Sequence, residues 1–433
     1  MRVLMAGLGV TGSAVVRAVV ADGDTVSAYD DSDDARERAA VLGVELVDLD
    51  DVAVKAAVAA SDLVVVTPGL PPDHRVAAAA RATGVSVIGD IELAARRTST
   101  PLVAVTGTNG KSTITQLTTD ILNASGVRAV AAGNIGVALI DAIAEPADVY
   151  VVEVSSQQLF STESFRPAVA VWSNLSPDHL DWHPSLEHYI TAKARIWANQ
   201  GSEDVAVVNA DDVVVMDAAQ DAPGRVVTFG DGGDARVEGG RLVGPGDADL
   251  GATTDLARPF PHDVTNALAA ACAGLSAGAT PAGVRAALRD FRGLPHRIEL
   301  VGHIGGVAYY DDSKATTPAS VVTALRSFPS VVLIAGGKNK GLDLQPLATA
   351  ADHVRAVVAI GSAADDVAAV FDGLRPVVHA DSMDAAVNAA ATLAQPGDVV
   401  LLSPACTSWD AYRDYAARGD DFARAVHERQ RLS

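Results

Sequence analysis

Short runs of Val, Leu and Ile alternate with longer Ala-rich stretches along almost the whole chain. The short runs are nearly continuous in apolar side chains, which is typical of strands in a parallel sheet that helices cover on both faces. The longer stretches have the period of amphipathic helices. The pattern therefore predicts an α/β protein in which strands and helices alternate.

The alternation falls into three series. The first opens with RVLMAGLG at residues 2–9 and ends before RRTSTP at residues 96–101, a segment that breaks both periods and predicts a linker. The second opens with PLVAVTGTNGKST and includes a Gly-rich stretch at residues 230–251, where we expect exposed hairpins. The third begins near GLPHRIEL at residues 293–300. We therefore predict three α/β domains, which the length of 433 residues also favours.

Composition narrows the classes of function. The chain has 33 Lys and Arg against 54 Asp and Glu, a formal charge of −21, so it lacks the basic surface that binds nucleic acid or anionic membranes. Two cysteines, Cys272 and Cys406, are too few for a disulfide framework. The charge-free run at residues 264–284 contains Asn, Gly, Ser and Pro, which favours a buried helix and a turn over a membrane span. No export signal is evident, and we expect a soluble cytoplasmic protein.

A first glycine motif follows the first predicted strand. Gly7, Gly9 and Gly12 form GxGxxG, and Asp30 ends the next strand. Glycines at these places permit a tight turn and let a phosphate approach a helix N-terminus, as in dinucleotide-binding proteins. A tight turn without a ligand is the alternative.

A second motif, TGTNGKST at residues 106–113, lies between a predicted strand and a predicted helix. In that context backbone N–H groups wrap phosphates, Lys111 neutralises them and Ser112 can bind Mg²⁺. The general phosphate-loop motif has glycine five residues before Gly110, where this chain has Val105. The shorter form still predicts nucleotide binding, because a structural turn would not require Lys and Ser at these places.

Lysine is rare, with six lysines against 27 arginines. Such a composition leaves lysine where a compact ammonium or a reactive amine is needed, and only Lys55 resembles an ordinary surface lysine. Glu153, His179 and Lys193 follow the phosphate loop in that order, and Glu153 ends a predicted strand. Together they predict a Mg²⁺ site, although singly each fits a surface Glu, a helix-capping His or a solvated Lys.

Three polar segments of the third series, DDSKATTP, AGGKNKG and SPACTSWD, each follow a predicted strand. They should meet at one edge of a parallel sheet, where ligands bind. Their hydroxyls, cations and glycines suit a small carboxylate. Ordinary turns remain the alternative for any one of them.

Eight segments together resemble one known family, the Mur ligases, and in detail its members that add D-glutamate to UDP-N-acetylmuramoyl-L-alanine. The segments span most of the chain: TGTNGKST at 106–113, GNIG at 133–136, EVSSQQL at 153–159, NLSPDHLD at 174–181, AKARI at 192–196, LPHR at 294–297, DSKAT at 312–316 and SPACTS at 403–408.

The resemblance implies an ATP-dependent amide ligase of peptidoglycan precursor synthesis with three domains. Residues 1–97 would form a Rossmann-like domain that binds the UDP-sugar, so GxGxxG would serve UDP and not NAD. Residues 98–293 would form the central domain with a parallel sheet of the P-loop ATPase type, which binds ATP. Residues 294–433 would form a second Rossmann-like domain that contributes amino-acid and nucleotide contacts. The partners would be UDP-N-acetylmuramoyl-L-alanine and D-glutamate, bound by a monomer that inserts into no membrane.

The resemblance also implies a role for each matched position. Two Mg²⁺ ions would be held by Ser112, Glu153, His179 and a carbamylated Lys193, and the catalytic residues would be Lys111, Glu153, His179 and Lys193. ATP would contact Gly107, Thr108, Asn109, Gly110, Lys111, Ser112, Thr113, Asn266, Arg297 and Asp312. The UDP-sugar would contact the loop residues Val10 and Thr11 with Asn134 and His179. D-glutamate would contact Lys314, Thr316, Lys340, Ser408 and Tyr415.

The chain departs from the family pattern at four places. Asp30-Asp31-Ser32 replaces a common Asp-Thr-Arg at the uracil site, His262-Asp263 a common His-Asn near adenine, Gln157 a common Phe, and Tyr415 the usual Phe. Three alternatives stay open: another Mur-type or folylpolyglutamate-type ligase, a plain phosphate-loop ATPase, and a nucleotide-sensing module without catalysis.

Overall fold

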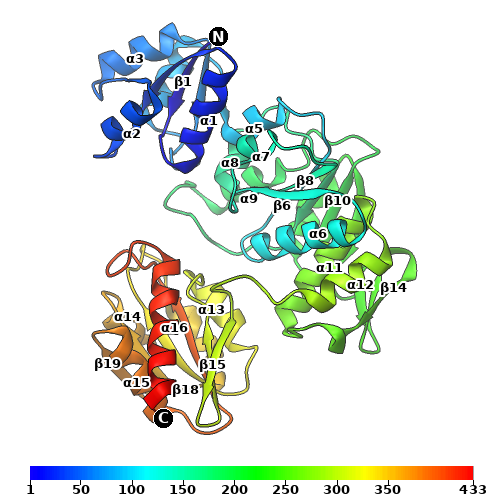
Figure 1. Cartoon of the computed structure of the whole chain (residues 1–433), viewed down its shortest axis with the longest axis vertical. Helices are drawn as coiled ribbons and strands as arrows, with labels where there is room; N and C mark the ends of the chain where they lie inside the picture. The colour runs from blue at the N-terminus through cyan, green and yellow to red at the C-terminus, as the bar shows by residue number, and fades with distance from the viewer. Residues whose placement is uncertain (433) are drawn as a thin grey trace. The chain divides into compact units, whose positions relative to one another are not determined.

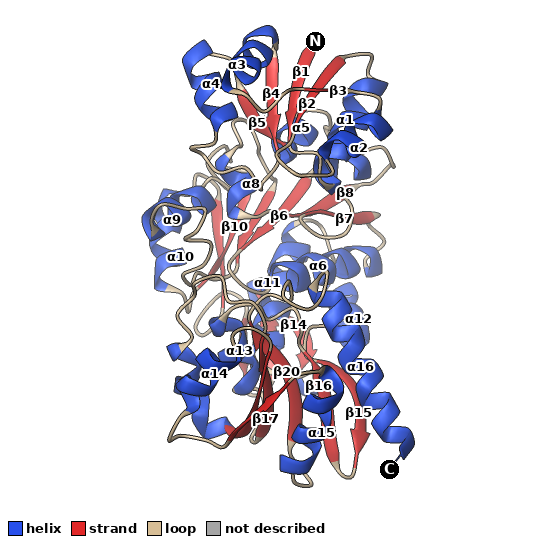
Figure 2. Cartoon of the chain, turned by 90° about the vertical axis from the view of Figure 1, so that its left-hand side faces the viewer, coloured by secondary structure: helices blue, strands red, loops and turns tan. Residues whose placement is uncertain are grey.

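The computed structural model describes residues 1–432, and within them strands and helices alternate as predicted (Figures 1 and 2). The chain forms two compact units. The first comprises Met1–Pro259 and Asp263–Phe291, and the second comprises Phe260–His262 and the residues from Arg292 onward.

The first sheet is parallel, with strand order β3-β2-β1-β4-β5. Its strands are β1 (Arg2–Ala6), β2 (Thr25–Tyr29), β3 (Glu45–Leu46), β4 (Leu63–Val66) and β5 (Val87–Gly89). Its helices are α1 (Val10–Ala21), α2 (Ala35–Leu42), α3 (Asp51–Ala60), α4 (Arg75–Thr83) and α5 (Asp90–Ala95). The chain adds β2 and β3 on one side of β1, and then β4 and β5 on the other side. Ligands of such sheets bind at the carboxyl ends of the strands beside the point where the order changes side, here between β1 and β4.

The central sheet is also parallel, with order β11-β10-β9-β6-β8-β7. Its strands are β6 (Leu102–Thr106), β7 (Ala129–Gly133), β8 (Val149–Glu153), β9 (Val169–Trp172), β10 (Val205–Asn209) and β11 (Arg225–Phe229). Every residue of β6, β8 and β10 is buried. This explains the unbroken apolar runs, because a central parallel strand is covered on both faces.

The helices that accompany the central sheet are α6 (Lys111–Ala124), α7 (Leu139–Ala142), α8 (Ser156–Phe160), α9 (Leu186–Ala194), α10 (Val213–Ala218), α11 (Pro261–Ser276) and α12 (Pro281–Asp290). The Gly-rich stretch forms the predicted hairpins as a small antiparallel sheet of β12 (Arg236–Glu238), β13 (Arg241–Gly244) and β14 (Ala248–Ala252). The charge-free run lies in α11 and the start of α12. Within residues 1–432, no helix has the length and apolar character that crossing a bilayer requires.

The second unit contains one sheet, with order β15-β16-β20-β17-β18-β19. Its strands are β15 (Glu299–Ile304), β16 (Val307–Asp311), β17 (Val331–Gly336), β18 (Val354–Ile360), β19 (Val377–Ala380) and β20 (Val399–Ala405). Its helices are α13 (Pro318–Leu325), α14 (Ala364–Phe371), α15 (Met383–Leu393) and α16 (Tyr415–Leu432). Helix α16 packs along β15 (Figure 1).

One strand of this sheet differs from the parallel arrangement that we predict for all three. Strand β15 pairs antiparallel with β16. Gly305 and Gly306 join the two strands with positive φ angles of 59° and 82°. Two consecutive residues with positive φ make the tight turn of a β-hairpin, so this edge folds back on itself without a crossover helix.

In the first unit, the carboxylate of Glu92 fastens α5 to the loop that follows α8. It is fully buried and accepts hydrogen bonds from the N–H groups of Glu163 (2.9 Å), Ser164 (3.0 Å) and Phe165 (2.9 Å). The Nε of Arg96 donates to it at 2.7 Å. Although burial raises the pKa of Glu92, these hydrogen bonds hold that pKa below its ordinary value. Helix α5, which follows the first sheet, is thereby tied to the loop after α8 of the central sheet.

We predict that Glu92→Ala lowers the free energy of unfolding by about 3 kcal/mol, because the N–H groups of Glu163, Ser164 and Phe165 and the side chain of Arg96 lose a fully buried acceptor. Urea unfolding followed by circular dichroism measures the change. Glu163→Gln is the matched control, since Glu163 is about half exposed, pairs with the same Arg96 and should cost less than about 1 kcal/mol. Equal unfolding midpoints for Glu92→Ala and the unmodified protein would contradict this role.

Candidate active site

The phosphate-loop motif connects β6 to the N-terminus of α6. Gly110, just before the helix, has a φ of +82°, and a Cβ added there would lie 2.5 Å from the Oδ1 of Asn266 on α11. Two features therefore favour glycine at position 110: its left-handed backbone angle and the close approach of the Asn266 side chain. The first turn of α6 begins at Lys111, so its N–H groups face outward from the helix N-terminus, where anions bind.

The loop after β9 forms hydrogen bonds with residues 108 and 109 of the phosphate-loop motif. The N–H of Thr108 donates to the carbonyl of Asn174 at 3.1 Å, and the N–H of Asn109 donates to the Oδ1 of Asn174 at 2.9 Å. The hydroxyl of Ser173 donates to the carbonyl of Asn109 at 2.8 Å. Two backbone N–H groups that the motif offers for phosphates thus bind Asn174, which the sequence alone does not assign a role.

Two lysines donate to one carbonyl oxygen of this loop. The Nζ of Lys111 and the Nζ of Lys193 each lie 2.9 Å from the oxygen of Gly107. Lys193 is only 1% exposed, so the solvated alternative for it is wrong. Burial, and after it the charge of Lys111, lowers the pKa of Lys193 well below its ordinary value. The surroundings of Lys193 therefore favour the neutral amine over the ammonium form.

Glu153 ends β8 and pairs in register with Val105 of β6, which places its carboxylate beside the phosphate loop. The side chain is 2% exposed, and its Oε1 accepts a hydrogen bond from the Nδ2 of Asn134 at 2.8 Å. Its Oε2 is buried and has no hydrogen-bond partner among residues 1–432. A buried carboxylate oxygen without a donor fits a cation ligand, and Ser112, 2% exposed on α6, is the hydroxyl that the motif supplies.

His179 lies in the loop after β9 in a left-handed backbone conformation, with a φ of 54°. The N–H groups of Trp182 and His183 donate to its carbonyl at 3.0 and 2.8 Å, which closes a tight turn behind it. Burial lowers the pKa of His179; the carboxylate of Asp178 opposes this shift and the charge of Lys111 adds to it. A neutral imidazole is the form that binds metal.

A buried histidine that none of the sequence motifs predicts supports this turn. His183 is fully buried, with its Nε2 2.9 Å from the hydroxyl of Ser156 and its Nδ1 2.8 Å from the Nδ1 of His188. Burial, with the nearby charge of His188, lowers the pKa of His183 to about 4. Its position four residues after His179 is the one signal in the sequence that could have drawn attention to it.

The glycine turn of the first sheet is held by Asp30. Its carboxylate accepts hydrogen bonds from the N–H groups of Leu8 (2.5 Å) and Ser32 (2.9 Å). The sequence predicts that Val10 and Thr11 lie in a loop. This prediction is wrong, because both residues lie in the first turn of α1. The helix begins at Val10 because Gly7 and Gly9 already complete the turn. Val10 and Thr11 therefore lie at a helix N-terminus.

The second unit gathers the remaining predicted residues at the carboxyl ends of its strands. Asp312 follows β16, and burial raises its pKa to about 7 although the hydroxyl of Ser403 donates to it at 2.7 Å. Arg297, whose charge acts to lower that pKa, follows His296. The Nδ1 of His296 lies 2.6 Å from the Oδ2 of Asp311. These groups form one polar cluster beside Asp312.

Arg418 of α16 joins two of the loops. It is 1% exposed, and its Nη2 donates to the carbonyls of Ser313 at 2.8 Å and Cys406 at 3.2 Å. The loops that carry Lys314 and Ser408 are therefore held together by a buried guanidinium.

The expected D-glutamate residues lie on these loops and beside them. Lys314 lies over the ring of Tyr415, with its Nζ 5.0 Å from the ring centroid. Thr316 is half-buried and lies just before α13, Ser408 is 2% exposed, and Lys340 is exposed in the loop after β17.

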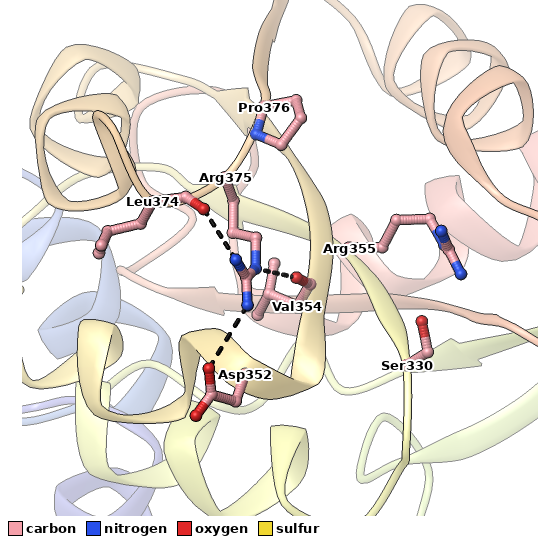
Figure 3. A pocket seen from close by; sticks show the side chains of 7 residues that line it. All are labelled: Ser330, Asp352, Val354, Arg355, Leu374, Arg375 and Pro376. Carbon is pink, nitrogen blue, oxygen red and sulfur yellow. Dashed lines mark hydrogen bonds and ion pairs between the residues drawn. The ribbon is translucent and has the colours of Figure 1, made fainter.

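One hollow of the second unit lies at the amino ends of strands β17, β18 and β19, opposite the carboxyl ends, and contains none of the predicted residues. It has a volume of about 360 Å³ and is lined by Ser330, Asp352, Val354, Arg355, Leu374, Arg375 and Pro376 (Figure 3). Arg375 donates to the carbonyls of Val354 and Leu374, and Arg355 pairs with Asp398 at 2.5 Å. The two arginines that line the hollow are already paired within the chain, so the hollow is a weaker candidate for binding an anionic ligand than the predicted site.

Three Mur ligase domain profiles match the chain. The MurD-like N-terminal domain matches residues 1–89, the Mur ligase middle domain residues 105–274, and the glutamate ligase domain residues 296–406. The chain belongs to the Mur ligase family. The resemblance drawn from the motifs is confirmed, and the family's use of ATP and Mg²⁺ agrees with the phosphate loop and the unpaired oxygen of Glu153.

Curated relatives match over nearly their whole length. A UDP-N-acetylmuramoylalanine–D-glutamate ligase from Frankia casuarinae is 44% identical over 99% of this chain and 94% of its own. One from Desulfosudis oleivorans is 41% identical over 98% of this chain and 96% of its own.

Solved Mur ligases share the fold. The UDP-N-acetylmuramate-alanine ligase MurC of Thermotoga maritima has a TM-score of 0.63 at 21% identity and covers all of both chains. MurF of Acinetobacter baumannii has a TM-score of 0.60 at 18% identity and covers 93% of this chain and 87% of its own. The predicted α/β Mur-type fold is confirmed.

We predict that Gly110→Ala weakens MgATP binding at least tenfold, because it combines left-handed strain with a collision against Asn266. Calorimetric titration with MgATP measures the loss. Gly126→Ala is the matched control, since Gly126 has a φ of +84° at the other end of α6 and no atom within 4 Å of the added carbon. Unchanged ATP affinity in Gly110→Ala would contradict the proposed contact between the loop and nucleotide.

Proposed function

We propose that this chain joins D-glutamate to UDP-N-acetylmuramoyl-L-alanine, with ATP converted to ADP and phosphate, in the synthesis of peptidoglycan precursors. The observation that carries the proposal is the cluster of Lys111, Lys193 and Glu153 around the phosphate loop. The names and near full-length coverage of the D-glutamate-adding relatives support the choice of substrates.

The reaction requires activation of a carboxylate. The carboxylate of the UDP-sugar takes the γ-phosphoryl group of ATP to form an acyl phosphate, the amine of D-glutamate attacks its carbonyl carbon, and the tetrahedral intermediate expels phosphate. Such transfer depends on positioning and on neutralising charge. Lys111 would neutralise the β- and γ-phosphates, and the N–H groups at the start of α6 would hold them.

We propose that Ser112 and Glu153 hold one Mg²⁺, and that His179 and a carbamylated Lys193 hold a second. Bound Mg²⁺ would neutralise the charge that develops on the transferred phosphoryl group. A neutral Lys193 amine can attack carbon dioxide and release one proton to give a carbamate, which supplies the carboxylate oxygens that Mg²⁺ prefers. The lowered pKa of Lys193 supports this step.

The other expected ligand contacts are proposed residue by residue. The loop at residues 107–113 and Asn266 would contact ATP, and Arg297 and Asp312 of the second unit would contribute nucleotide contacts. Val10, Thr11, Asn134 and His179 would position the UDP-sugar. Lys314, Thr316, Lys340, Ser408 and Tyr415 would surround D-glutamate, where two ammonium groups suit an amino acid with two carboxylates.

We further propose three domains with boundaries at residues 1–97, 98–293 and 294–433, each containing one of the three large sheets. The protein would act as a monomer in the cytoplasm. The scarcity of cysteine and the absence of disulfide bonds among the described residues are in keeping with a reducing compartment.

Phosphate release from ATP and Mg²⁺ in the presence of UDP-N-acetylmuramoyl-L-alanine tests the function. We expect release that depends on D-glutamate, with L-glutamate, L-alanine and a diamino acid inactive, and a ligated product detected by mass spectrometry. Release driven by another amino acid would reassign the substrate of the second unit. Release that needs no amino acid would overturn the ligase in favour of an ATPase.

Lys193→Ala should nearly abolish ligation, because the carbamate oxygens are lost, and short-chain carboxylic acids should restore part of the rate. Activity with and without added acetate or propionate measures this rescue. Lys55→Ala is the matched control, because Lys55 lies on α3 of the first sheet. Full activity of Lys193→Ala in bicarbonate-free buffer would rule out the carbamate.

A further inference from the structure

One tryptophan of the second unit lies at the edge where the D-glutamate residues gather. Trp172 and Trp197 are core residues, 0% and 2% exposed, whereas Trp409 is 60% exposed in the loop after β20. A single exposed apolar side chain is ordinary in itself. Its neighbour is not ordinary, because the Nζ of Lys340 lies 4.3 Å from the centroid of the indole ring.

Backbone hydrogen bonds hold the loops that carry Lys340 and Trp409 together. Lys338 and Thr407 form an isolated antiparallel bridge between the loops that follow β17 and β20. The N–H of Lys338 donates to the carbonyl of Thr407 at 2.8 Å, and the N–H of Thr407 donates back at 3.0 Å. The hydroxyl of Thr407 adds a third hydrogen bond at 2.9 Å. Lys340 and Trp409 each follow two residues after this bridge, so the two side chains are brought together by hydrogen-bonded loops.

The charge of Lys340 stays available in this arrangement. The chain has 54 acidic residues, yet Lys340 makes no ion pair among the residues that the structure describes. The face of an indole attracts an ammonium without neutralising it, and tryptophan is the best residue for this contact. Lys314 lies over Tyr415 in the same way. Both expected cations of the site thus lie over aromatic rings, and the charge of Lys340 remains able to bind a carboxylate.

We propose that Trp409 is a positioning residue that holds the Lys340 ammonium on its indole face, ready for the side-chain carboxylate of the incoming amino acid. The inference rests on the proposed D-glutamate ligation. A flexible lysine loses rotamer freedom when it binds a ligand, so a ring that already orders it increases the affinity for that ligand. The effect concerns binding of the amino acid and leaves the phosphoryl transfer unchanged.

Steady-state kinetics of Trp409 variants test the proposal. Trp409→Leu should raise the Michaelis constant for D-glutamate about three- to tenfold, with kcat within about twofold and the constants for ATP and the UDP-sugar unchanged. Trp409→Phe should recover most of the affinity, because it restores an aromatic face. Leu374→Ala is the matched control, since Leu374 is 46% exposed near the amino end of β19 in the same sheet.

The Lys340→Met background separates the cation contact from simple packing. There, Trp409→Leu should change the Michaelis constant for D-glutamate by less than about twofold, because the ammonium that the ring orders is gone. An effect as large as in the unmodified protein would overturn the cation contact, as would an unchanged Michaelis constant in Trp409→Leu alone.

Turnover of the unmodified enzyme distinguishes failure of the proposed D-glutamate ligation from failure of the proposed role of Trp409. Absence of D-glutamate-dependent turnover there would reject the proposed function, whereas normal turnover with insensitivity to Trp409 would reject this inference alone.

Discussion

Two lysine side chains, those of Lys111 and Lys193, donate to one carbonyl oxygen, that of Gly107, and the proposed chemistry of the first unit depends on this contact. Lys111 is the cation of the phosphate-loop motif, and burial, followed by the charge of Lys111, lowers the pKa of Lys193. Under the proposed function, Lys193 would react through its neutral amine, and Glu153 would supply an anionic metal ligand nearby.

The order of strands explains how these groups meet. Strand β6 lies between β8 and β9 in the central sheet, so the loops after all three strands emerge side by side at one edge. The phosphate loop follows β6, Glu153 ends β8 and His179 follows β9. The second unit repeats the principle, since β16, β20 and β17 are neighbours and their loops carry Asp312, Ser408 and Lys340. Parallel topology thus brings residues that are distant in sequence together at one edge.

Much of this could be predicted from the sequence, because apolar runs mark buried parallel strands and polar motifs mark their ends. The phosphate loop, Glu153 at the end of its strand and the hairpins of the Gly-rich stretch lie where the pattern places them. The antiparallel β15 could not be recognised in the same way, since its direction depends on the two-glycine turn before β16.

Side-chain surroundings could not be predicted either. A lysine in a helical stretch is normally solvated, so the burial of Lys193 follows only from the packing of α9 against the phosphate loop. The turn support from His183 and the stacking of Lys340 on Trp409 are likewise contacts between segments that no local pattern encodes. Even the helical start at Val10 depends on how the glycine turn closes.

The most direct test of this account is ¹³C NMR of the enzyme equilibrated with ¹³C-bicarbonate between about pH 6 and 9. We expect one protein-bound carbamate signal that disappears in Lys193→Ala. In Lys111→Met the signal should require higher pH, because removing the neighbouring charge raises the pKa of Lys193 and leaves less neutral amine at a given pH. A signal with the same pH dependence in Lys111→Met would contradict the coupling of the two lysines, and no signal in the unmodified enzyme would contradict the account as a whole.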